Sequence, residues 1–289
     1  MLSVERSNRT EKLLAALALR WASSRRDPLA PAVVVVQGQG MERWIAQALA
    51  REQGVCANTE FLFPRNLLER VLGASRGQGG AAADSRWEPR QLVWWLARRL
   101  ETHRDAPELA RLASPLRGVD GDWRLLQLAH QLAHLFDRYI TDRPDRVLLW
   151  PSVDLARLDP EERWQAWLFR GLVEDLGGDH LAGRAASLVE RLRSEDSDVF
   201  ASGLEGALPE AIEVFAVSTL APLYLGVLDA LAMRIDVHLS ILSPSRVYWG
   251  DLWRELRDEE WVGRVGTGIA PETETETETE TETVNECEV

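Results

Sequence analysis

The sequence is almost devoid of lysine: Lys12 is the only one in 289 residues. Val33–Asn58 has the order of a buried strand, a glycine turn and an amphipathic helix, which is the order found around a nucleotide-binding P-loop. A working P-loop needs G-x-x-x-x-G-K-[ST], with the lysine on the phosphates and the hydroxyl on Mg²⁺. Here the turn Gly38–Gly40 continues into Met41. The sequence therefore predicts the shape of the loop without the chemistry of ATP hydrolysis.

Cysteine and long apolar runs are also scarce. Cys56 and Cys287 are isolated thiols, so neither a disulfide framework nor a zinc site is indicated. No apolar run approaches the roughly 18 residues of a membrane span, and Met1–Arg9 lacks the apolar core of a signal peptide. With 45% hydrophobic and 27% charged residues, the composition is that of a globular protein. We expect a cytoplasmic location without membrane contact.

Basic residues are absent from the last 18 residues, which hold eight carboxylates and include six Glu-Thr repeats at Glu272–Thr283. Without these carboxylates the net charge of −13 becomes about −5. A dipeptide array has no apolar face to bury, so we expect Glu272–Val289 to lack packed contacts. The array is either a functional acidic tail or a coding accident beyond a truncated domain. The acidic total does not exclude nucleic-acid binding, which depends on local charge.

Strand-like runs occur in the first 36 residues and again between residues 212 and 242. Leu2–Arg6 and the four-valine run Val33–Val36 precede helical periodicity. Ile212–Val217 and Ile235–Leu242 flank a helix expected at Pro222–Met233. A strand, a helix and a second strand in succession are typical of a parallel sheet. We therefore expect all four strands to lie in one sheet.

The middle of the chain differs in kind. From Ser85 to about Leu192 there is no convincing strand, and leucines and tryptophans recur at helical spacing. Most of the twelve tryptophans fall at core spacing, so packing is the default role for them. The sequence predicts an α/β sheet interrupted by an all-helical insertion. We divide it into sheet-forming parts 1–75 and 206–255, a helical insertion 76–205 and a Glu-Thr-rich tail 256–289.

Several segments have the order and spacing of a known family. They are Ser7–Arg9, VVVVQGQGMERW at Val33–Trp44, Ala57-Asn58 followed by Phe61–Pro64, LFDRYITDRPD at Leu135–Asp145, and SRVYWGD at Ser245–Asp251. From residue 1 to about residue 255 the chain resembles the N-terminal part of RecC, the gamma subunit of exodeoxyribonuclease V. The resemblance implies a P-loop-helicase-like parallel sheet with an inactive nucleotide site.

The resemblance also implies a function without catalysis in this chain. RecC belongs to the RecBCD-type helicase/nuclease that repairs double-strand breaks by homologous recombination. It lies between two motor subunits, splits the duplex, guides the separated strands and scans the 3′-ended strand for the Chi signal. The partners implied are DNA, as single strands and as a fork, and RecB-like and RecD-like subunits. No cofactor is implied.

The family's DNA-reading surface maps onto nine positions, to which we add Arg138. Those that match the family are Gln37, Leu135, Asp137, Arg143 and Arg184, while Gln39, Arg43, Phe63 and His134 occupy reader positions with different side chains, and Arg138 accompanies Asp137 in the insertion. The residues alone leave other roles open. Asp137 and Arg143 also fit caps or bridges at helix ends, and Leu135 also fits a core stripe. The side-chain amides of Gln37 and Gln39, beside exposed backbone N–H groups of the glycine turn, suit base edges or phosphates.

An enzymatic alternative rests on one helix face. His130, His134 and Asp137 recur at i, i+4 and i+7, and HQLAH superficially resembles the zinc-protease H-E-x-x-H. Gln131 stands where the general base belongs, and no lysine follows an acidic pair as a D…E-x-K nuclease requires. A metal-dependent hydrolase on this face is the alternative function, and an inert gene fragment is a third reading. The metal content of the purified protein separates the first two, and the neighbouring reading frame tests the third.

Overall fold

The computed structural model describes residues 1–24, 31–75, 85–112, 121–194, 208–217 and 219–243. These residues belong to one folded unit of the α/β class. The Glu-Thr array and the SRVYWGD segment lie outside the described residues. Among the described helices, none is long and apolar enough to cross a membrane.

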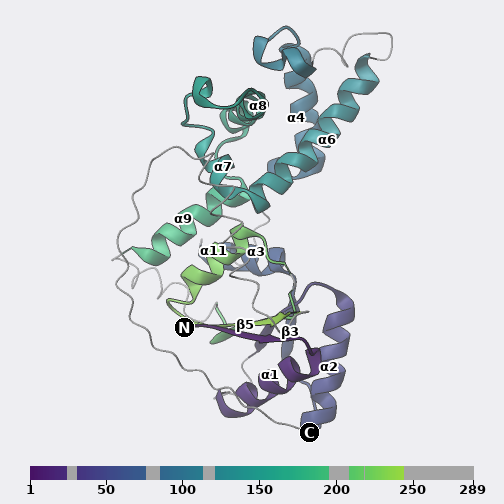
Figure 1. The fold of residues 1–289 in the computed structure, drawn as a ribbon, viewed down its shortest axis with the longest axis vertical. Coiled ribbons are helices and arrows are strands. Elements are labelled where there is room, and N and C mark those ends of the chain that lie inside the picture. Colours follow the sequence, from purple (N-terminus) through teal and green to yellow (C-terminus); the bar gives the residue numbers. More distant parts are fainter. Residues whose placement is uncertain (25–30, 76–84, 113–120, 195–207, 218, 244–289) are drawn as a thin grey trace. The chain divides into compact units, whose positions relative to one another are not determined.

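Five parallel strands form one sheet in the order β1-β5-β4-β2-β3. The sheet is seen nearly edge-on in Figure 1. Their bounds are β1 Leu2–Ser7, β2 Ala32–Val35, β3 Thr59–Leu62, β4 Ala211–Phe215 and β5 Asp236–Leu242. Val33 pairs with Ile212, and Leu2 pairs with Val237. The prediction that the four strand-like runs share one sheet is therefore confirmed. The edge strand β3 was not predicted as a strand.

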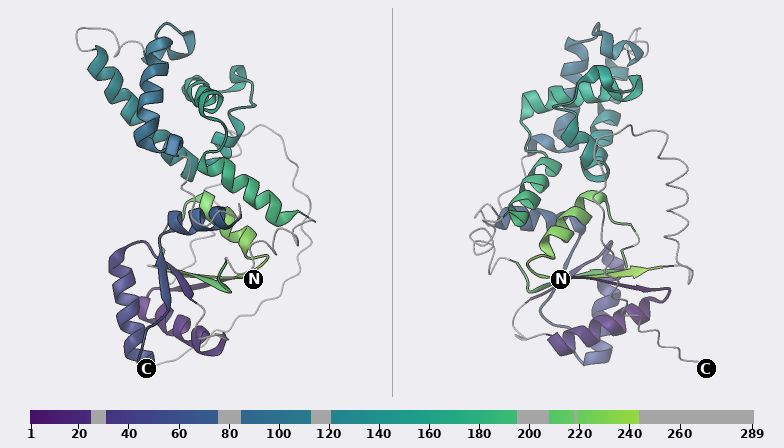
Figure 2. Two further views of the ribbon diagram at one scale, coloured as in Figure 1. Left: turned by 180° about the vertical axis from the view of Figure 1, so that it is seen from behind. Right: turned by 60° about the vertical axis from the view of Figure 1, so that its left-hand side comes forward.

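Helices cover both faces of the sheet (Figure 2). α1 (Thr10–Ser24) and α2 (Gln39–Gln53) pack on one face, where Leu17 and Ile45 meet Val34 in a small apolar cluster. α3 (Pro64–Ala74) and α11 (Pro222–Leu231) cover the other face. Side chains alternate along a strand, so Val33 and Val35 face this second layer.

The described part of the middle region is helical, as the sequence predicts. Its elements are η1 Ser85–Trp87, α4 Pro89–Thr102, η2 Pro107–Leu109, α6 Gly121–Asp142, α7 Pro144–Leu149, η3 Leu155–Arg157, α8 Pro160–Leu176 and α9 Leu181–Arg193. Several of these helices begin with proline, whose fixed φ suits the first turn and whose missing N–H is no loss there. Because the stretches 76–84 and 195–207 are not described, the domain boundaries drawn from the sequence stay predictions.

The core of this helical region is continuous with the α3/α11 face of the sheet. α4 and α6 pack along each other through leucines such as Leu92, Leu96 and Leu100, all without exposed surface. Each fully buried leucine contributes about 1.5–3 kcal/mol. An aromatic group of Phe136, Trp150 and Phe169 fills the space between α6, α7 and α8 with edge-to-face contacts. The helical region is thereby packed onto the sheet as part of the same folded unit.

Candidate nucleic-acid interface

The carboxyl edge of the sheet has its topological switch point between β2 and β4. β2 leads through α2 outward to β3, whereas β4 leads through α11 in the opposite direction to β5. Open parallel sheets bind ligands in the crevice that forms where connections diverge in this way. Gln37 follows β2, and its Nε2 donates to the carbonyl oxygen of Thr219, which follows β4, at 3.1 Å. Gln37 therefore spans the crevice.

The start of α2 lies beside Gln37. Its N-cap, Gly38, has φ −168 and ψ 159, an extended conformation that any residue can adopt, and no side chain caps the helix. A Cβ at Gly38 or Gly40 would meet no atom within 4 Å, so neither glycine is required by packing within the chain. Gln39 and Arg43 are exposed, one helical turn apart. An amide and a guanidinium thus stand in open space next to the switch point.

The neighbouring strand β3 joins this edge to the helical region. Phe63 is 36% exposed directly after β3, and Arg65, in the first turn of α3, donates to Oδ1 of Asp137 on α6 at 3.5 Å. Tyr224 of α11 lies at the same junction: burial raises its pKa, and the negative charge of Asp137 raises it further, while Arg65 opposes the shift. The structure therefore brings Asp137 to the carboxyl edge of the sheet.

An apolar cleft opens at this junction. It is lined by Val35, Pro64, Leu67, Leu220, Tyr224 and Val227 among others. Its walls come from β2, α3, α11 and the segment that precedes α11. The volume of this recess is about 10 Å³, enough for roughly one water molecule, so it belongs to the packing between α3 and α11 and is too small for a ligand pocket.

Three of the candidate DNA-binding residues project from α6 and from the start of α7. His134 is exposed and contacts His130 edge-to-face, with ring centroids 4.7 Å apart. Arg138 reaches Asp142 at 3.9 Å, and Arg143, the N-cap residue of α7, reaches Asp145 at 3.7 Å. Exposed pairs of this kind contribute only about 0–1 kcal/mol, so they leave both guanidinium groups available to phosphates.

Two other positions are occupied by packing. Leu135 is half-buried and packs against the apolar core. Arg184 of α9 has a side chain only 8% exposed, and its two terminal nitrogens donate to both carboxylate oxygens of Glu69 in α3, at 3.1 and 3.2 Å. This geometry favours a structural role for Arg184, which ties α9 to α3. We therefore leave Arg184 out of the surface proposed below.

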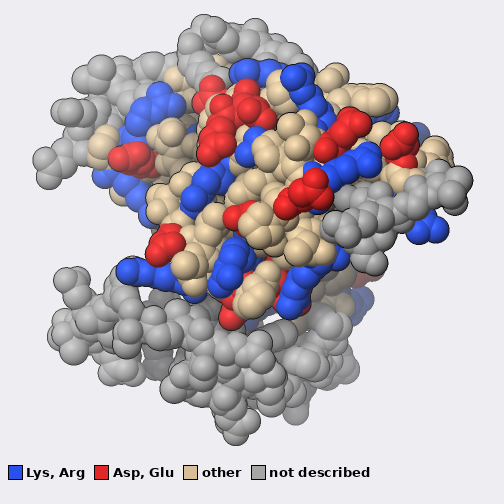
Figure 3. Space-filling view, turned by 90° about the horizontal axis from the view of Figure 1, so that it is seen from above, with Lys and Arg blue, Asp and Glu red and all other residues tan. Residues whose placement is uncertain are grey.

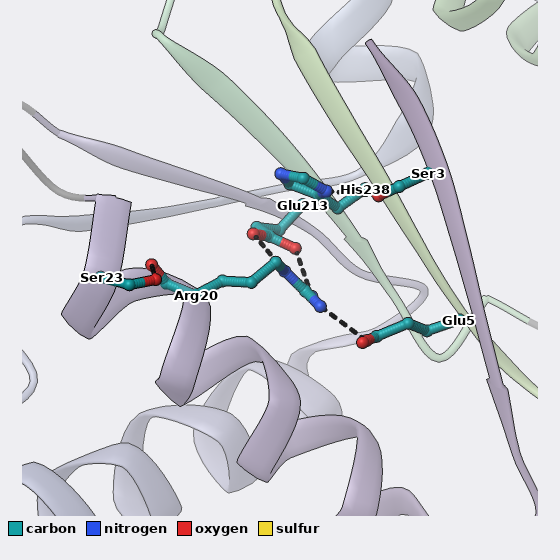
Figure 4. A network of polar contacts seen from close by, with 6 residues as sticks. All are labelled: Ser3, Glu5, Arg20, Ser23, Glu213 and His238. Carbon is teal, nitrogen blue, oxygen red and sulfur yellow. Dashed lines mark hydrogen bonds and ion pairs between the residues drawn. The ribbon is translucent and has the colours of Figure 1, made fainter. Parts of the chain in front are cut away.

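A second polar network lies on the opposite face of the sheet, under α1 (Figure 4). Arg20 donates to both carboxylate oxygens of Glu213, at 3.3 and 2.9 Å, and to Glu5 at 2.6 Å. Burial lowers the pKa of Arg20, but the bonds to Glu213 and Glu5 outweigh it and the net shift is upward. Ser3 and His238 lie 2.5 Å apart through Oγ and Nδ1.

This row of serine, histidine and glutamate side chains on adjacent strands is not a catalytic triad. A triad requires the carboxylate to orient the histidine and the other ring nitrogen to contact the hydroxyl. Both oxygens of Glu213 are occupied by Arg20, and no hydrogen bond joins Glu213 to His238, both of which the structure describes. The network therefore holds α1 on the sheet.

The metal-dependent alternative is not favoured. Asp137, its third proposed ligand, pairs with Arg65. Within the described ranges, no group of three or more His, Cys, Asp or Glu side chains is placed to hold a metal ion. On the face seen in Figure 3, arginines are interspersed with acidic residues and form no single basic surface. Any nucleic-acid site on that face would have to rest on local groups and not on a broad basic surface.

The fold and the site together define an open parallel α/β protein with polar groups gathered at its switch point. Residues 2–264 match the family model for the N-terminal domain of RecC, and the chain belongs to this family.

Three relatives are named RecBCD enzyme subunit RecC. The protein of Mycobacterium tuberculosis H37Rv is 31% identical over 271 residues, covering 88% of this chain and 23% of the relative. That of Escherichia coli K12 is 30% identical over 259 residues, covering 87% and 22%. That of Haemophilus influenzae is 26% identical over 275 residues, covering 87% and 24%. The chain thus spans less than a quarter of the length of these relatives.

Sequence reasoning missed three residues of the site. Arg65, Thr219 and Tyr224 form the contacts that join α3, the segment after β4 and the helical region to the candidate site residues. Arg65 directly follows the Phe61–Pro64 segment, so its position was a usable signal. Thr219 and Tyr224 lie about 180 residues from Gln37, and nothing local marks them.

Proposed function

We propose that this chain is the N-terminal portion of a non-catalytic, DNA-binding subunit of a RecBCD-type helicase/nuclease. One observation carries the proposal: in a member of the RecC N-terminal domain family, the Arg65–Asp137 pair joins the helical region to the sheet edge that holds Gln37. We infer that the residue after β2, the start of α2 and α6 present polar side chains to one ligand. A single strand passing over this edge would meet groups from both regions at once.

The side chains divide by the part of DNA that each suits. Arg43, Arg138 and Arg143 are cations for phosphates. The amides of Gln37 and Gln39 and the carboxylate of Asp137 suit base edges. Phe63 and His134 offer rings for stacking, and Leu135 offers an apolar contact. We propose that these groups guide the separated strand and read a recombination signal of the Chi type.

We propose further that the sheet is helicase-like and that its nucleotide site is inactive. The turn between β2 and α2 has Met41 in place of a phosphate-binding lysine, and Lys12 lies elsewhere in the sequence. Energy for unwinding would then come from RecB-like and RecD-like partners in the cytoplasm, and the complex would act in double-strand-break repair. The expected result is no ATP hydrolysis by this chain in the presence of single-stranded DNA. Turnover that is abolished by a substitution at Met41 or Gly40 contradicts this proposal.

Binding to labelled single-stranded DNA tests the surface directly. Arg143→Ala should weaken binding to every sequence and reduce the slope of log affinity against log salt by about 0.7. Arg157→Ala is the matched control, because Arg157 is exposed, pairs only weakly with Asp154 at 3.9 Å and lies in η3, which packs against α8. Equal effects of the two variants would contradict the proposed surface. Absence of any DNA binding by folded protein favours the inert-fragment reading instead.

A further inference from the structure

α6 exposes one continuous face that extends well beyond the candidate site. Its exposed residues include Trp123, Arg124, Gln127, His130, His134 and Arg138. They recur at spacings of three and four, so they lie on one side of the helix and span about 22 Å along its axis. We call this surface the α6 face. Its Arg138 end adjoins Asp137, which contacts the sheet edge through Arg65.

The α6 face carries positive and neutral groups. Asp137 is the only carboxylate between residues 123 and 138, and it is turned to Arg65. Asp122, at the start of the helix, pairs with Arg104 at 3.3 Å. Arg124 has no ion-pair partner among the residues that the structure describes. Arg138 pairs only at 3.9 Å with the exposed Asp142, so Arg124 is the one cation of the face without an ion pair among the described residues. A helix face with an unpaired cation, a weakly paired one and no carboxylate between residues 123 and 136 complements a polyanion.

Trp123 sets this face apart from an ordinary solvated surface. Its side chain is 70% exposed, although the large apolar area of tryptophan normally favours burial. The other exposed residues on the face are polar, so an apolar protein interface core does not surround it. An isolated exposed ring among cations and amides is the arrangement with which proteins stack bases of single strands.

We infer that the α6 face carries single-stranded DNA for several nucleotides beyond the sheet edge, with Trp123 stacking a base and Arg124 contacting a phosphate. The inference rests on the proposed function. Helix positions four residues apart are separated by about 6 Å along the axis, so successive side chains can meet successive nucleotides of an extended strand. The strand would run from Arg138 past His134 and His130 to Trp123.

Oligonucleotide length tests the inference in the full chain. Oligothymidines of roughly 4 and roughly 16 nucleotides bracket the site sizes of single-strand binders. Trp123→Ala should weaken the longer oligonucleotide at least about five-fold and leave the shorter one unchanged, because the shorter one is held at the sheet edge. Arg124→Gln should reduce the salt slope for the longer one by about 0.7.

Matched controls come from other elements. Trp94 on α4 is 66% exposed, and Arg51 is exposed in the last turn of α2. Trp94→Ala and Arg51→Gln should change neither oligonucleotide. All four variants alter exposed side chains, so thermal unfolding should stay unchanged and show that each protein is folded.

The outcomes separate the inference from the proposed function. If Trp123→Ala matches Trp94→Ala at both lengths while Arg143→Ala weakens both, the inference is wrong and the proposed function stands. If the unaltered chain binds neither oligonucleotide, both fail. If Trp123→Ala leaves DNA affinity intact but weakens association with the partner subunits, the α6 face is a protein interface and the inference is overturned.

Discussion

On the sheet face covered by α1 and α2, Glu213 is only 3% exposed, whereas its neighbours Ile212 and Val214 on β4 point into the apolar face covered by α3 and α11. The first face thus buries a charge and neutralises it with Arg20. The face covered by α3 and α11 is apolar, and its polar neighbours, such as Gln37 and Arg65, lie at the carboxyl edge of the sheet. Polar residues under α1 are buried in the fold, whereas Gln37 and Arg65 at the edge also bond within the chain but remain exposed to solvent.

The largest expected effect comes from removing the cation of the buried network. Arg20→Ala leaves Glu213 buried without its partner, which should lower the free energy of unfolding by about 3–5 kcal/mol. Urea denaturation at neutral pH measures the loss. The double variant Arg20→Ala with Glu213→Gln should recover part of it, since no uncompensated charge remains. If the single and double variants are equally stable, the pair does not hold α1 in the way described.

The helical region extends the comparison, because it buries the neutral side chain of His180. His180 caps α9 by accepting from the backbone N–H of Gly183 at 3.1 Å, and burial lowers its pKa from 6.5 to about 4. The folded state therefore stays neutral where the unfolded state takes up a proton. This contribution to stability is complete above pH 6.5 and is lost as the pH falls toward 4.

Between pH 7 and pH 5 the loss attributable to His180 should be about 2 kcal/mol. His180→Asn keeps an acceptor at the N-cap but does not titrate. The difference in unfolding free energy between the two pH values should therefore be smaller by that amount in the variant. An identical pH dependence in both proteins would show that His180 is not held neutral.

The pair of variants Arg184→Ala and Arg143→Ala tests the division between fold and ligand. Arg184→Ala should lower stability by about 1–2 kcal/mol, because Glu69 loses both bonds but remains 26% exposed. Its affinity for single-stranded DNA should be unchanged. Arg143→Ala should leave stability unchanged and weaken the binding of single-stranded DNA. If folded Arg184→Ala binds DNA weakly, Arg184 belongs to the DNA surface as the family resemblance implies.

The smallest expected effect on stability is that of Gln37→Ala. Loss of its bond to Thr219 across the switch point should lower stability by at most about 1 kcal/mol. Its effect on DNA should appear as relaxed sequence preference, by about 1–3 kcal/mol for a bidentate contact. Competition between oligonucleotides of different sequence measures it. Unchanged preference, with unchanged affinity, would place Gln37 in the fold alone.

The sequence was sufficient to predict most helices and strands, because their apolar residues recur periodically. It was insufficient to predict which polar side chains pair between these elements. The runs at Val33–Val36 and Ile212–Val217 predicted central strands, because central strands of a parallel sheet are apolar on both faces. β3 was missed because Thr59–Leu62 is only four residues long and half-buried throughout, so it has neither alternation nor an apolar run.

Ionic partners were beyond the reach of local patterns. Arg20 and Glu213 are 193 residues apart, and Arg184 and Glu69 are 115 apart. A buried arginine in an ion pair and an exposed arginine on a DNA surface have the same sequence signature. The tryptophans show the same limit: Trp44, Trp95 and Trp167 pack against the apolar cores as expected from their spacing. Trp94 and Trp123 are exposed, and the sequence did not distinguish them from the others.

The pairing of β1 with β5 has a consequence for biosynthesis. The strand β1 gains its neighbour only when Val237, the pairing partner of Leu2, has been synthesised. At about 5–20 residues per second, the ribosome needs roughly 12 to 47 seconds to extend the chain from Leu2 to Val237. Local helix pairs such as α4 and α6 can form during that interval, because their contacts are close in sequence. The first strand to be made is thus among the last to be paired, and a nascent chain arrested before β5 carries β1 as an open edge on which other chains can aggregate.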